Sequence, residues 1–582
     1  MNLTEEQKQV INSTGNIKIN AVAGSGKTTT LVEYVNARQQ PDKKFLYLAF
    51  NASVKKHVSA KFNSLGIGNV RVETAHSLAY KHIVRKRGYQ IEQNYKLNDL
   101  VRILDIRHRD SMLTFLVANH IKKFAAYYCN TSAEKVQDLD YLSTVADPMA
   151  RTFAEQYYEQ IEYGTRIFLT KMLRGEIPVT HDFYLKMFQL SNPVLKYDYI
   201  LFDEGQDASP CMLDVFLRQN GNKIIVGDTN QQIYSWRYAV NSLETVKGFT
   251  ELSLTQSFRL DSELAELSQN ILGWKNLLDS SSFNLRIRGT SGRTGIKTRA
   301  TIARTNLRLL TRAIELSTGY GAIGKIYFEG NIASYTYAGE GASLYDVLNL
   351  QQGNYHLIKD DLIREMKSIP ELKEYADRSE ENELSMLIDI VEEYGAELPS
   401  HIRRLKEKHV PDCDREDADM VFSTVHRCKG MEYDEVTVEK DFVSEDVILR
   451  QSKSGKTDKM ALDALNEEIN LLYVAVTRAR CKLKIPEELT DADSRELILN
   501  SGRHILISSD KEKHAPVYSR KITRDKNSGG EIWSRELDGQ LEQKLQKKTP
   551  LKFIAKQMNI PRKEVIRRIR ELELFNRYDI YY

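Results

Sequence analysis

The sequence of 582 residues predicts an α/β protein with two parallel-sheet domains, each carrying a helical insertion, and a small all-α unit at its C-terminal end. Short apolar runs, typical of buried parallel strands, alternate with longer helical patterns. Two strand-poor blocks with helical patterns separate the groups of strands, and the turn-forming residues 527–530 precede the helical patterns of the C-terminal unit. The eight expected strands are 17–22, 45–50, 199–202, 223–226, 297–303, 419–424, 435–438 and 482–485.

The strand groups set the expected domain boundaries. The first sheet domain comprises residues 1–85 and 193–248, with a helical insertion at 86–192. The second sheet domain comprises residues 249–330 and 413–510, with a compact helical insertion at 331–412. Residues 511–582 form the C-terminal unit.

The composition is that of an ordinary globular protein, with 41% apolar and 28% charged residues. Fibrous and wholly disordered classes are therefore excluded. No apolar run is long enough to cross a bilayer and the first residues lack a signal-peptide pattern, so we expect an intracellular protein without a membrane partner. The sequence leaves open whether that compartment is a nucleus or a bacterial or viral cytoplasm. The five cysteines are scattered and predict neither a zinc site nor disulfides.

Charge is distributed unevenly along the chain. The net charge is only +3, which does not by itself indicate a nucleic-acid partner. Residues 511–582 hold 18 Lys and Arg against 10 Asp and Glu, whereas residues 1–510 carry a net charge of −5. The C-terminal unit is thus a basic appendage on a mildly acidic body.

A strand, a glycine-rich loop and a helix follow one another near the N-terminus. The loop of residues 21–28 reads Ala-Val-Ala-Gly-Ser-Gly-Lys-Thr, with Ala21 in place of the first glycine of the strict P-loop pattern. Backbone N–H groups and the helix N-terminus of such a loop bind phosphates, Lys reaches the β and γ oxygens, and Thr binds Mg²⁺. The alternative is a loop that binds no ligand. The predicted ATP-binding residues are Ala23, Gly24, Ser25, Gly26, Lys27, Thr28 and Thr29.

Two adjacent carboxylates end the expected strand 199–202. Asp203 and Glu204 stand where Mg²⁺-dependent nucleotide hydrolysis needs them. We expect Thr28 and Asp203 to bind the metal and Glu204 to act as the general base, with Lys27 on the phosphates. A solvated acidic loop is the alternative, which the preceding apolar strand makes less favourable.

The remaining motifs, taken in order, resemble those of superfamily 1 DNA helicases of the UvrD/Rep/PcrA kind. Leu-Thr-Glu-Glu-Gln at 3–7 resembles the Q motif, and Leu-Ala-Phe-Asn at 48–51 and Thr-Ala-His-Ser at 74–77 resemble motifs Ia and Ib. The segment 226–237 resembles motif III, 254–259 motif IV, 424–432 motif V and 473–479 motif VI. The resemblance covers roughly residues 3–490 and implies two RecA-like P-loop NTPase domains with helical insertions.

This resemblance assigns the other residues of the ATP site. Gln7 would contact the adenine edge, Phe258 would stack on the adenine, and Glu432 would contact the ribose. Gln231 would sense the γ-phosphate from the first domain. Arg259 and Arg478 would reach the transferred phosphoryl group from the second domain as arginine fingers. The predicted catalytic residues are Lys27, Asp203, Glu204, Gln231, Arg259 and Arg478.

The resemblance also implies a track for single-stranded DNA and its junctions with duplex. Aromatic stacking holds single strands without base preference, and phosphate contacts make the binding sensitive to salt. For Trp236, the alternative to stacking on DNA is a buried structural role. The predicted DNA-binding residues are Phe50, Asn51, His76, Tyr234, Trp236, Arg237 and His426.

Within this group the sequence is most similar to the helicase core of F-box DNA helicases. Gly205 replaces the aromatic usual in the UvrD type, and the segments 179–186 and 390–394 also fit the F-box branch. Since the Q motif begins at Leu3, we expect no F-box and no ubiquitin-ligase role. The resemblance implies 3′→5′ movement in DNA repair, recombination or replication, and suggests the removal of proteins such as recombinase filaments from DNA.

The C-terminal residues 531–574 give three short helical patterns that resemble a helix-turn-helix module. Such a module could contact duplex DNA or another protein, and the sequence does not separate these alternatives. The predicted protein is therefore an ATP- and Mg²⁺-dependent DNA translocase and helicase. A nuclease subunit would need a metal-binding carboxylate cluster in an added domain, which the sequence lacks. A weakly catalytic ATP switch that recruits partners through 531–574 is the other alternative.

Overall fold

The computed structural model describes residues 3–235, 238–239, 241–278, 286–290, 295–317, 323–330, 332–337, 341–453, 459–501, 504–508, 535–546 and the single positions 554, 557, 558, 565, 568, 569 and 572. The chain divides into two compact units, Met1–His514 and Ala515–Tyr582. Among the described residues, no helix combines the length and the apolar character that crossing a bilayer requires.

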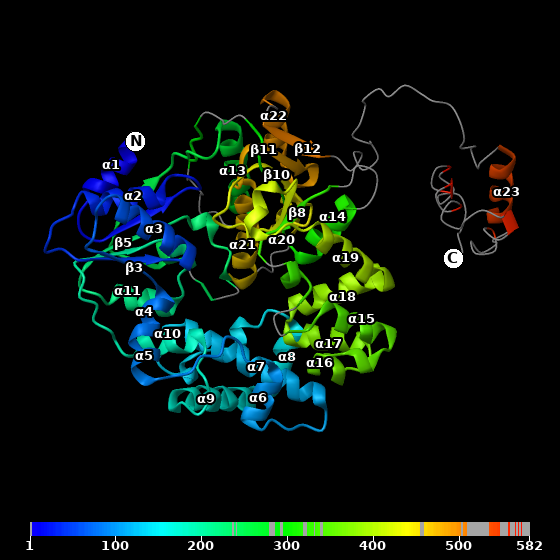
Figure 1. Ribbon diagram of the computed structural model, residues 1–582, viewed down its shortest axis with the longest axis horizontal. Coiled ribbons are helices and arrows are strands. Elements are labelled where there is room, and N and C mark those ends of the chain that lie inside the picture. Colours follow the sequence, from blue (N-terminus) through cyan, green and yellow to red (C-terminus); the bar gives the residue numbers. More distant parts are fainter. Residues whose placement is uncertain are drawn as a thin grey trace. The chain divides into compact units, whose positions relative to one another are not determined.

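The described residues of the first unit form two sheets of six strands, and the strand pairs in both sheets are parallel (Figure 1). This confirms the predicted α/β class with two sheet domains. The first sheet has the order β3-β2-β4-β5-β1-β6. Its strands are β1 (Ile17–Ala21), β2 (Phe45–Ala49), β3 (Val70–Thr74), β4 (Tyr199–Phe202), β5 (Asn222–Gly227) and β6 (Thr250–Leu254).

The second sheet has the order β12-β11-β10-β7-β9-β8. Its inner strands are mostly buried, as is usual for parallel strands in the middle of a sheet. Its strands are β7 (Arg299–Ala303), β8 (Ile326–Phe328), β9 (Met420–Thr424), β10 (Tyr433–Val438), β11 (Ala479–Pro486) and β12 (Ile505–Ser508).

One expected domain boundary does not match the sheets. The sequence placed residues from 249 onward in the second domain, but β6 (Thr250–Leu254) pairs along its whole length with β1 of the first sheet. The first sheet therefore continues to Leu254, and the chain enters the second domain only after it. The cause of the error is that β6 is mostly exposed and lacks the apolar run of a buried strand.

Helices of the first domain begin at defined caps. Thr4 forms a capping box with Gln7 at the start of α1, and Thr74 forms another with Ser77 at the start of α4. Gly26 is in the left-handed conformation where α2 begins. The helices of this domain are α1 (Glu5–Asn12), α2 (Lys27–Asn36), α3 (Ala52–Ser64), α4 (Ala75–His82), α11 (Pro210–Leu217) and α12 (Ser242–Thr245).

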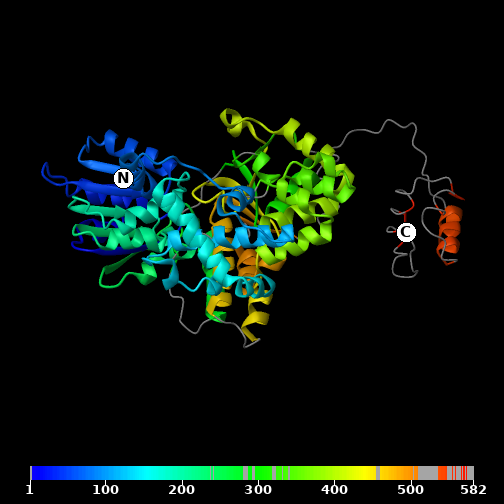
Figure 2. The same cartoon turned by 90° about the horizontal axis from the view of Figure 1, so that it is seen from below.

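The two insertions are helical, as expected, and they contact one another. Helices α7 and α8 of the first insertion pack against α17 of the second (Figures 1 and 2). The first insertion contains α5 (Val84–Arg87), α6 (Leu97–Leu104), α7 (Ser111–Asn130), α8 (Pro148–Gln156), α9 (Tyr158–Arg174) and α10 (His181–Leu190). The second contains α15 (Leu344–Gln352), α16 (Asp361–Glu365), α17 (Ile369–Ser379), α18 (Asn382–Tyr394) and α19 (Leu398–Lys408).

Three apolar clusters hold the first unit together. One lies on the α2 and α3 face of the first sheet, and a second fills the other sheet domain. The largest cluster extends from Leu46 and Leu48 of β2 through both insertions to Phe422 of β9. The helices of the second domain are α13 (Ser262–Gly273), α14 (Asn306–Ser317), α20 (Glu445–Lys453), α21 (Lys459–Val476) and α22 (Ala492–Ser501).

The second unit contains the helix α23 (Arg535–Gln546). Leu541 and Leu545 of this helix pack with Ile554, Val565 and Ile569 in a small apolar cluster. Arg568 forms an ion pair with Asp538 over 2.7 Å. Because that arginine already has a carboxylate partner, it is a poor candidate for a DNA phosphate contact. The rest of the expected helix-turn-helix pattern lies outside the described residues.

Candidate nucleotide and nucleic-acid site

The P-loop joins the carboxyl end of β1 to the first turn of α2. Gly24 and Gly26 have φ angles of +74° and +79°, which glycine adopts without strain. The Lys27 ammonium donates a hydrogen bond to the Ala21 carbonyl over 3.3 Å. The Ser25 hydroxyl oxygen is buried without a hydrogen-bond partner among the described residues. A loop of this shape, with an unsatisfied hydroxyl and a lysine at the helix start, fits a nucleotide phosphate.

Gly24 is also required for close contact with the second domain. A Cβ atom at Gly24 would lie 2.5 Å from the Cβ of Arg259 and 2.9 Å from the Ser257 hydroxyl oxygen. The Phe258 backbone N–H donates to the Gly24 carbonyl over 2.9 Å. Gln7 donates from Nε2 to the Ser25 carbonyl over 3.4 Å. Gln7 and the partly exposed Phe258 therefore both lie beside the P-loop, where the sequence predicted the adenine contacts.

Thr28 and Asp203 meet as predicted for a metal site. The Thr28 hydroxyl donates to Oδ2 of Asp203 over 3.4 Å, and the Tyr47 hydroxyl donates to the same oxygen over 2.5 Å. Burial, reinforced by the neighbouring Glu204, raises the pKa of Asp203 to about 6. A carboxylate and a hydroxyl are the hard oxygen ligands that Mg²⁺ prefers, so this donor set fits the metal. When bound, Mg²⁺ would neutralise charge on the phosphate oxygens.

Glu204 follows Asp203 in the left-handed conformation, with φ of +55°. Burial favours its neutral form, but Lys27, Lys429 and Arg478, with a hydrogen bond from Gln206, together lower its pKa. Gln206 donates to Glu204 over 2.6 Å. The positive field of three cations thus keeps Glu204 ionised, as a general base must be.

Lys429 connects the second domain to this carboxylate group. Its ammonium forms an ion pair with Asp207 and donates to the Gln231 carbonyl over 2.6 Å. The Asp207 side chain is fully buried, and burial raises its pKa to about 6 despite the lysine. Lys429 lies in the loop after β9, so it reaches across from one sheet domain to the other.

Gln231 is held from both domains. Its Nε2 donates to Oδ2 of Asp228 over 2.8 Å. The Tyr473 hydroxyl from α21 donates to the same carboxylate oxygen over 3.1 Å and accepts from the Ala23 backbone N–H over 3.3 Å. The predicted γ-phosphate sensor is therefore linked to the P-loop and to the second domain through Tyr473.

The two predicted arginine fingers lie together at the domain junction. Arg259 donates to Glu432 over 2.6 Å and 2.9 Å, and to the Thr477 carbonyl over 3.3 Å. Arg478 is 1% exposed and donates to the carbonyls of Val474 and Met431. Burial, with repulsion from Arg259, lowers the pKa of Arg478 to about 10. Glu432, the predicted ribose contact, is here the ion-pair partner of Arg259.

Aromatic side chains line the expected DNA side of the same junction. Phe50, which is 39% exposed, stacks on Tyr234 with ring centroids 5.9 Å apart. The Tyr234 hydroxyl donates to the His426 carbonyl over 3.1 Å, and their rings lie 6.0 Å apart. The structure thus brings together residues from the predicted motifs Ia, III and V.

Asn51 and His76 have local roles in the structure. The Asn51 side chain accepts from the Val54 N–H and caps α3. The His76 Nε2 lies 3.8 Å from an oxygen of Asp182, and its ring contacts those of His181 and Tyr184 edge-on. Trp236 and Arg237, the other two predicted DNA contacts, lie outside the described residues.

Sequence reasoning missed four site residues: Lys429, Asp207, Tyr473 and Tyr47. Lys429 and Tyr473 lie inside the predicted motifs V and VI, and Asp207 follows the predicted pair Asp203 and Glu204 by three residues, so their position was a usable signal. Tyr47 precedes motif Ia within a fully buried strand and carried no signal of its own.

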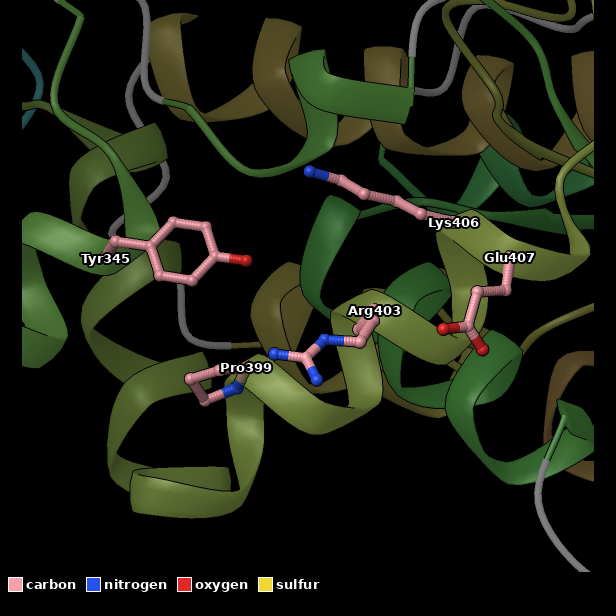
Figure 3. A pocket seen from close by; sticks show the side chains of 5 residues that line it. All are labelled: Tyr345, Pro399, Arg403, Lys406 and Glu407. Atoms are coloured by element: carbon pink, nitrogen blue, oxygen red, sulfur yellow. The ribbon is translucent and has the colours of Figure 1, made fainter.

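A separate hollow of about 450 Å³ lies in the second insertion (Figure 3). Tyr345 of α15 faces Arg403 of α19 across it. None of the residues predicted for ATP or DNA lines this hollow. Its complete lining is Tyr345, Pro399, Arg403, Lys406 and Glu407.

The fold and the site define a protein class. Two parallel-sheet domains meet at one P-loop. The first domain supplies the loop and an acidic pair, and the second domain supplies two arginines. This is the arrangement of a P-loop NTPase with paired RecA-like domains. The chain matches the family model for the UvrD/REP helicase N-terminal domain over residues 3–247 and the UvrD-like helicase C-terminal domain over residues 259–487. It belongs to the UvrD-like helicase family, which confirms the resemblance found in the motifs.

Individual relatives agree with this family. The chain is 32% identical to F-box DNA helicase 1 of Gallus gallus over 535 residues, which cover 87% of this chain and 50% of that protein. It is 28% identical to F-box DNA helicase protein 1 of Schizosaccharomyces pombe over 84% of this chain and 58% of that protein. DNA helicase II of Salmonella typhimurium is 24% identical over 51% of this chain and 41% of that protein. The chain thus spans about half the length of these relatives.

Proposed function

We propose that this protein is an ATP- and Mg²⁺-dependent translocase on single-stranded DNA and a 3′→5′ DNA helicase. The observation that carries the proposal is the junction between the two sheet domains. Lys27, Asp203 and Glu204 lie on the first domain. From the second domain, Arg259 lies against the P-loop and the charge of Arg478 acts on Glu204. A site divided between two domains can close on ATP and open after hydrolysis, which is what converts hydrolysis into movement.

DNA as the ligand is supported by the position of the aromatic residues. Phe50 and Tyr234 stack beside Lys429, whose ammonium lies 4.9 Å from the Tyr234 ring centroid. Lys429 also contacts Asp207 and Gln231 of the ATP site. A single strand stacked on these rings would therefore act on the same lysine that faces the hydrolytic carboxylates, coupling DNA binding to hydrolysis.

The first test is steady-state ATP hydrolysis with and without single-stranded DNA. We expect stimulation of at least about tenfold by DNA, which a DNA-coupled motor requires. Lys27→Ala and Glu204→Gln should abolish it, whereas Glu33→Gln, at the far end of α2, should not. A low rate that neither DNA nor these substitutions change would contradict the motor and favour an ATP switch that recruits partners.

Polarity and substrate need separate measurements. Strand displacement from duplexes with either a 3′ or a 5′ single-stranded tail should occur only with the 3′ tail and ATP. Within an intracellular role in DNA repair, recombination or replication, we further propose that the motor removes bound proteins. Preformed recombinase filaments on single-stranded DNA should be cleared in the presence of ATP and not by Glu204→Gln. Displacement only from 5′-tailed substrates would contradict the proposed direction.

A further inference from the structure

Three cations surround one buried carboxylate at the open edge of the first sheet. Glu73 of β3 is 2% exposed. Lys55 of α3 donates to it over 2.7 Å, Arg71 of the same strand over 3.0 Å, and Lys81 of α4 also forms an ion pair with it. Burial opposes ionisation, but the hydrogen bonds from these cations and from Ser77 lower the pKa of Glu73 to about 2. The carboxylate is thus charged at neutral pH and holds three cations in place.

A fourth cation extends this cluster. Lys86 of α5 is exposed and lies four residues after His82, the last residue of α4. Burial, together with the charges of Lys86 and Arg71, lowers the pKa of His82. The four cations, Lys55, Arg71, Lys81 and Lys86, are here called the edge patch. With Glu73 as their one carboxylate partner among the described residues, the group carries a net charge of +3. The side chains of Lys55, Arg71 and Lys81 are 33%, 48% and 39% exposed, so they can reach a ligand in solvent.

The edge patch continues the predicted DNA track. Lys55 lies four residues after Asn51 at the start of α3, and Lys81 lies five residues after His76 on α4. A helix rises 1.5 Å per residue, so these cations lie about 6–8 Å further along the same two helices. The described track residues supply rings and polar groups, whereas the edge patch supplies positive charge.

We propose that the edge patch binds phosphates of the single strand where it leaves the track, and so lengthens the stretch of DNA that the protein holds. This inference rests on the proposed function, because it places the strand on Phe50 and His76. Protection of the exposed edge of β3 against pairing with other strands would explain Arg71. It would not explain why lysines from α3 and α4 converge on the same carboxylate.

The experiment compares single-stranded oligothymidylates of about 8 and about 24 nucleotides, since one binding fold typically covers between about 4 and 16. Fluorescence anisotropy measures their affinity against salt for the parent and for the double variant Arg71→Gln/Lys86→Gln. This variant leaves Lys55 and Lys81 on Glu73. The matched control is Lys44→Gln/Lys247→Gln, which removes two exposed charges before β2 and β6, at the opposite ends of the strands.

Each lost phosphate contact lowers the salt slope by about 0.7, so the variant should lose about 1.4 on the longer oligonucleotide. Its affinity for that oligonucleotide should fall, while binding of the shorter one and the control should match the parent. Glu73→Gln removes the one negative charge of the group, which raises its net charge by one, and should strengthen binding of the longer strand. Equal salt slopes and equal affinities for the parent and the double variant would overturn the proposal. It would also be overturned if the double variant lost affinity for blunt duplex DNA alone.

The two proposals fail in different ways. If the protein is not a DNA motor, DNA of neither length stimulates ATP hydrolysis by the parent. If only the edge patch is wrong, the parent is stimulated and prefers the longer strand, and Arg71→Gln/Lys86→Gln leaves that preference unchanged.

Discussion

The hydroxyl of Tyr473 donates a hydrogen bond to Oδ2 of Asp228 over 3.1 Å. Tyr473 lies on α21 of the second domain, whereas Asp228 follows β5 of the first. The same oxygen accepts a hydrogen bond from Gln231. One carboxylate therefore joins a residue of the second domain to the glutamine that is expected to sense the γ-phosphate.

This relationship predicts a positioning role for Tyr473. Tyr473→Phe removes the hydroxyl that donates to Asp228 and accepts from the Ala23 N–H. The bond to the charged group alone is worth about 1.5 kcal/mol, so kcat for DNA-stimulated ATP hydrolysis should fall about tenfold. The KM for ATP should change less than about twofold, since the P-loop keeps its phosphate contacts. The matched control is Tyr327→Phe, which removes a 3.1 Å bond to Asp412 away from the junction. Equal kcat values for the two variants would contradict the role.

Lys429 should control the pH dependence of hydrolysis. It lowers the pKa values of Glu204 and Asp207 against the effect of their burial. Lys429→Met removes that positive charge, so both pKa values rise and the base is protonated at a higher pH. The acidic limb of the pH profile of kcat should therefore move to higher pH.

Stability provides a second measurement on the same lysine. Breaking a buried ion pair by removing one partner costs about 3–5 kcal/mol, so Lys429→Met should lower the free energy of unfolding by about that amount. Adding Asp207→Asn should recover most of the loss. Lys484→Met is the control. It removes an exposed lysine from Glu435, which keeps its ion pair with Arg299, and should cost about 1 kcal/mol or less. An unshifted pH profile in Lys429→Met would refute the electrostatic role.

The strands that the sequence predicted and those it missed differ in one respect. All eight predicted strands are interior to their sheets. The four strands that the sequence missed, β3, β6, β8 and β12, are the edge strands. Interior parallel strands are buried on both faces and are richer in apolar residues, as in β2 and β5. In β3 the one buried residue is Glu73, β6 exposes three of its five residues, and β8 has only three residues, so none of them forms a long apolar run.

The site divides in a similar way. Thr28 and Asp203 could be paired from sequence, because parallel strands bring the residues after β1 and β4 to the same edge of one sheet. The contact between Lys429 and Asp207 spans 222 positions and two domains. It depends on how the sheets face one another, which no local pattern encodes. The same is true of Tyr473 and Asp228.

Gly205 illustrates a position whose small size the structure explains. A Cβ atom there would lie 2.5 Å from Cγ1 of Ile225 and 2.9 Å from the hydroxyl oxygen of Ser242. Gly205→Ala should therefore destabilise the protein by about 1–3 kcal/mol, the usual cost of overpacking a core. In a double-mutant cycle with Ile225→Ala, measured by urea unfolding, the two changes should be less than additive, because the second makes room for the first. Strict additivity would mean that Ile225 does not limit this position.

His120 should make the stability of the protein depend on pH. It lies buried in α7, where Nε2 faces the Arg378 carbonyl at 3.2 Å and Nδ1 faces the Tyr141 hydroxyl at 2.8 Å. A carbonyl can only accept, so Nε2 donates to it and the neutral ring accepts the tyrosine hydrogen at Nδ1. Burial lowers the pKa of His120 to about 4, from 6.5 for an exposed histidine.

Because the unfolded chain binds this proton more readily, the contribution of His120 is fully present above about pH 6.5 and is lost as the pH falls toward 4. Between pH 7.5 and 5 the loss should be about 2 kcal/mol. His120→Gln keeps a donor and an acceptor without a titrating group. Over the same pH interval, its free energy of unfolding in urea should therefore fall by about 2 kcal/mol less than that of the parent. His57→Gln, on the exposed surface of α3, should follow the parent. Since Arg378 lies on α17, acidification should also weaken the contact between the two insertions. Identical pH profiles for His120→Gln and the parent would show that the His120 ring does not change its protonation on unfolding.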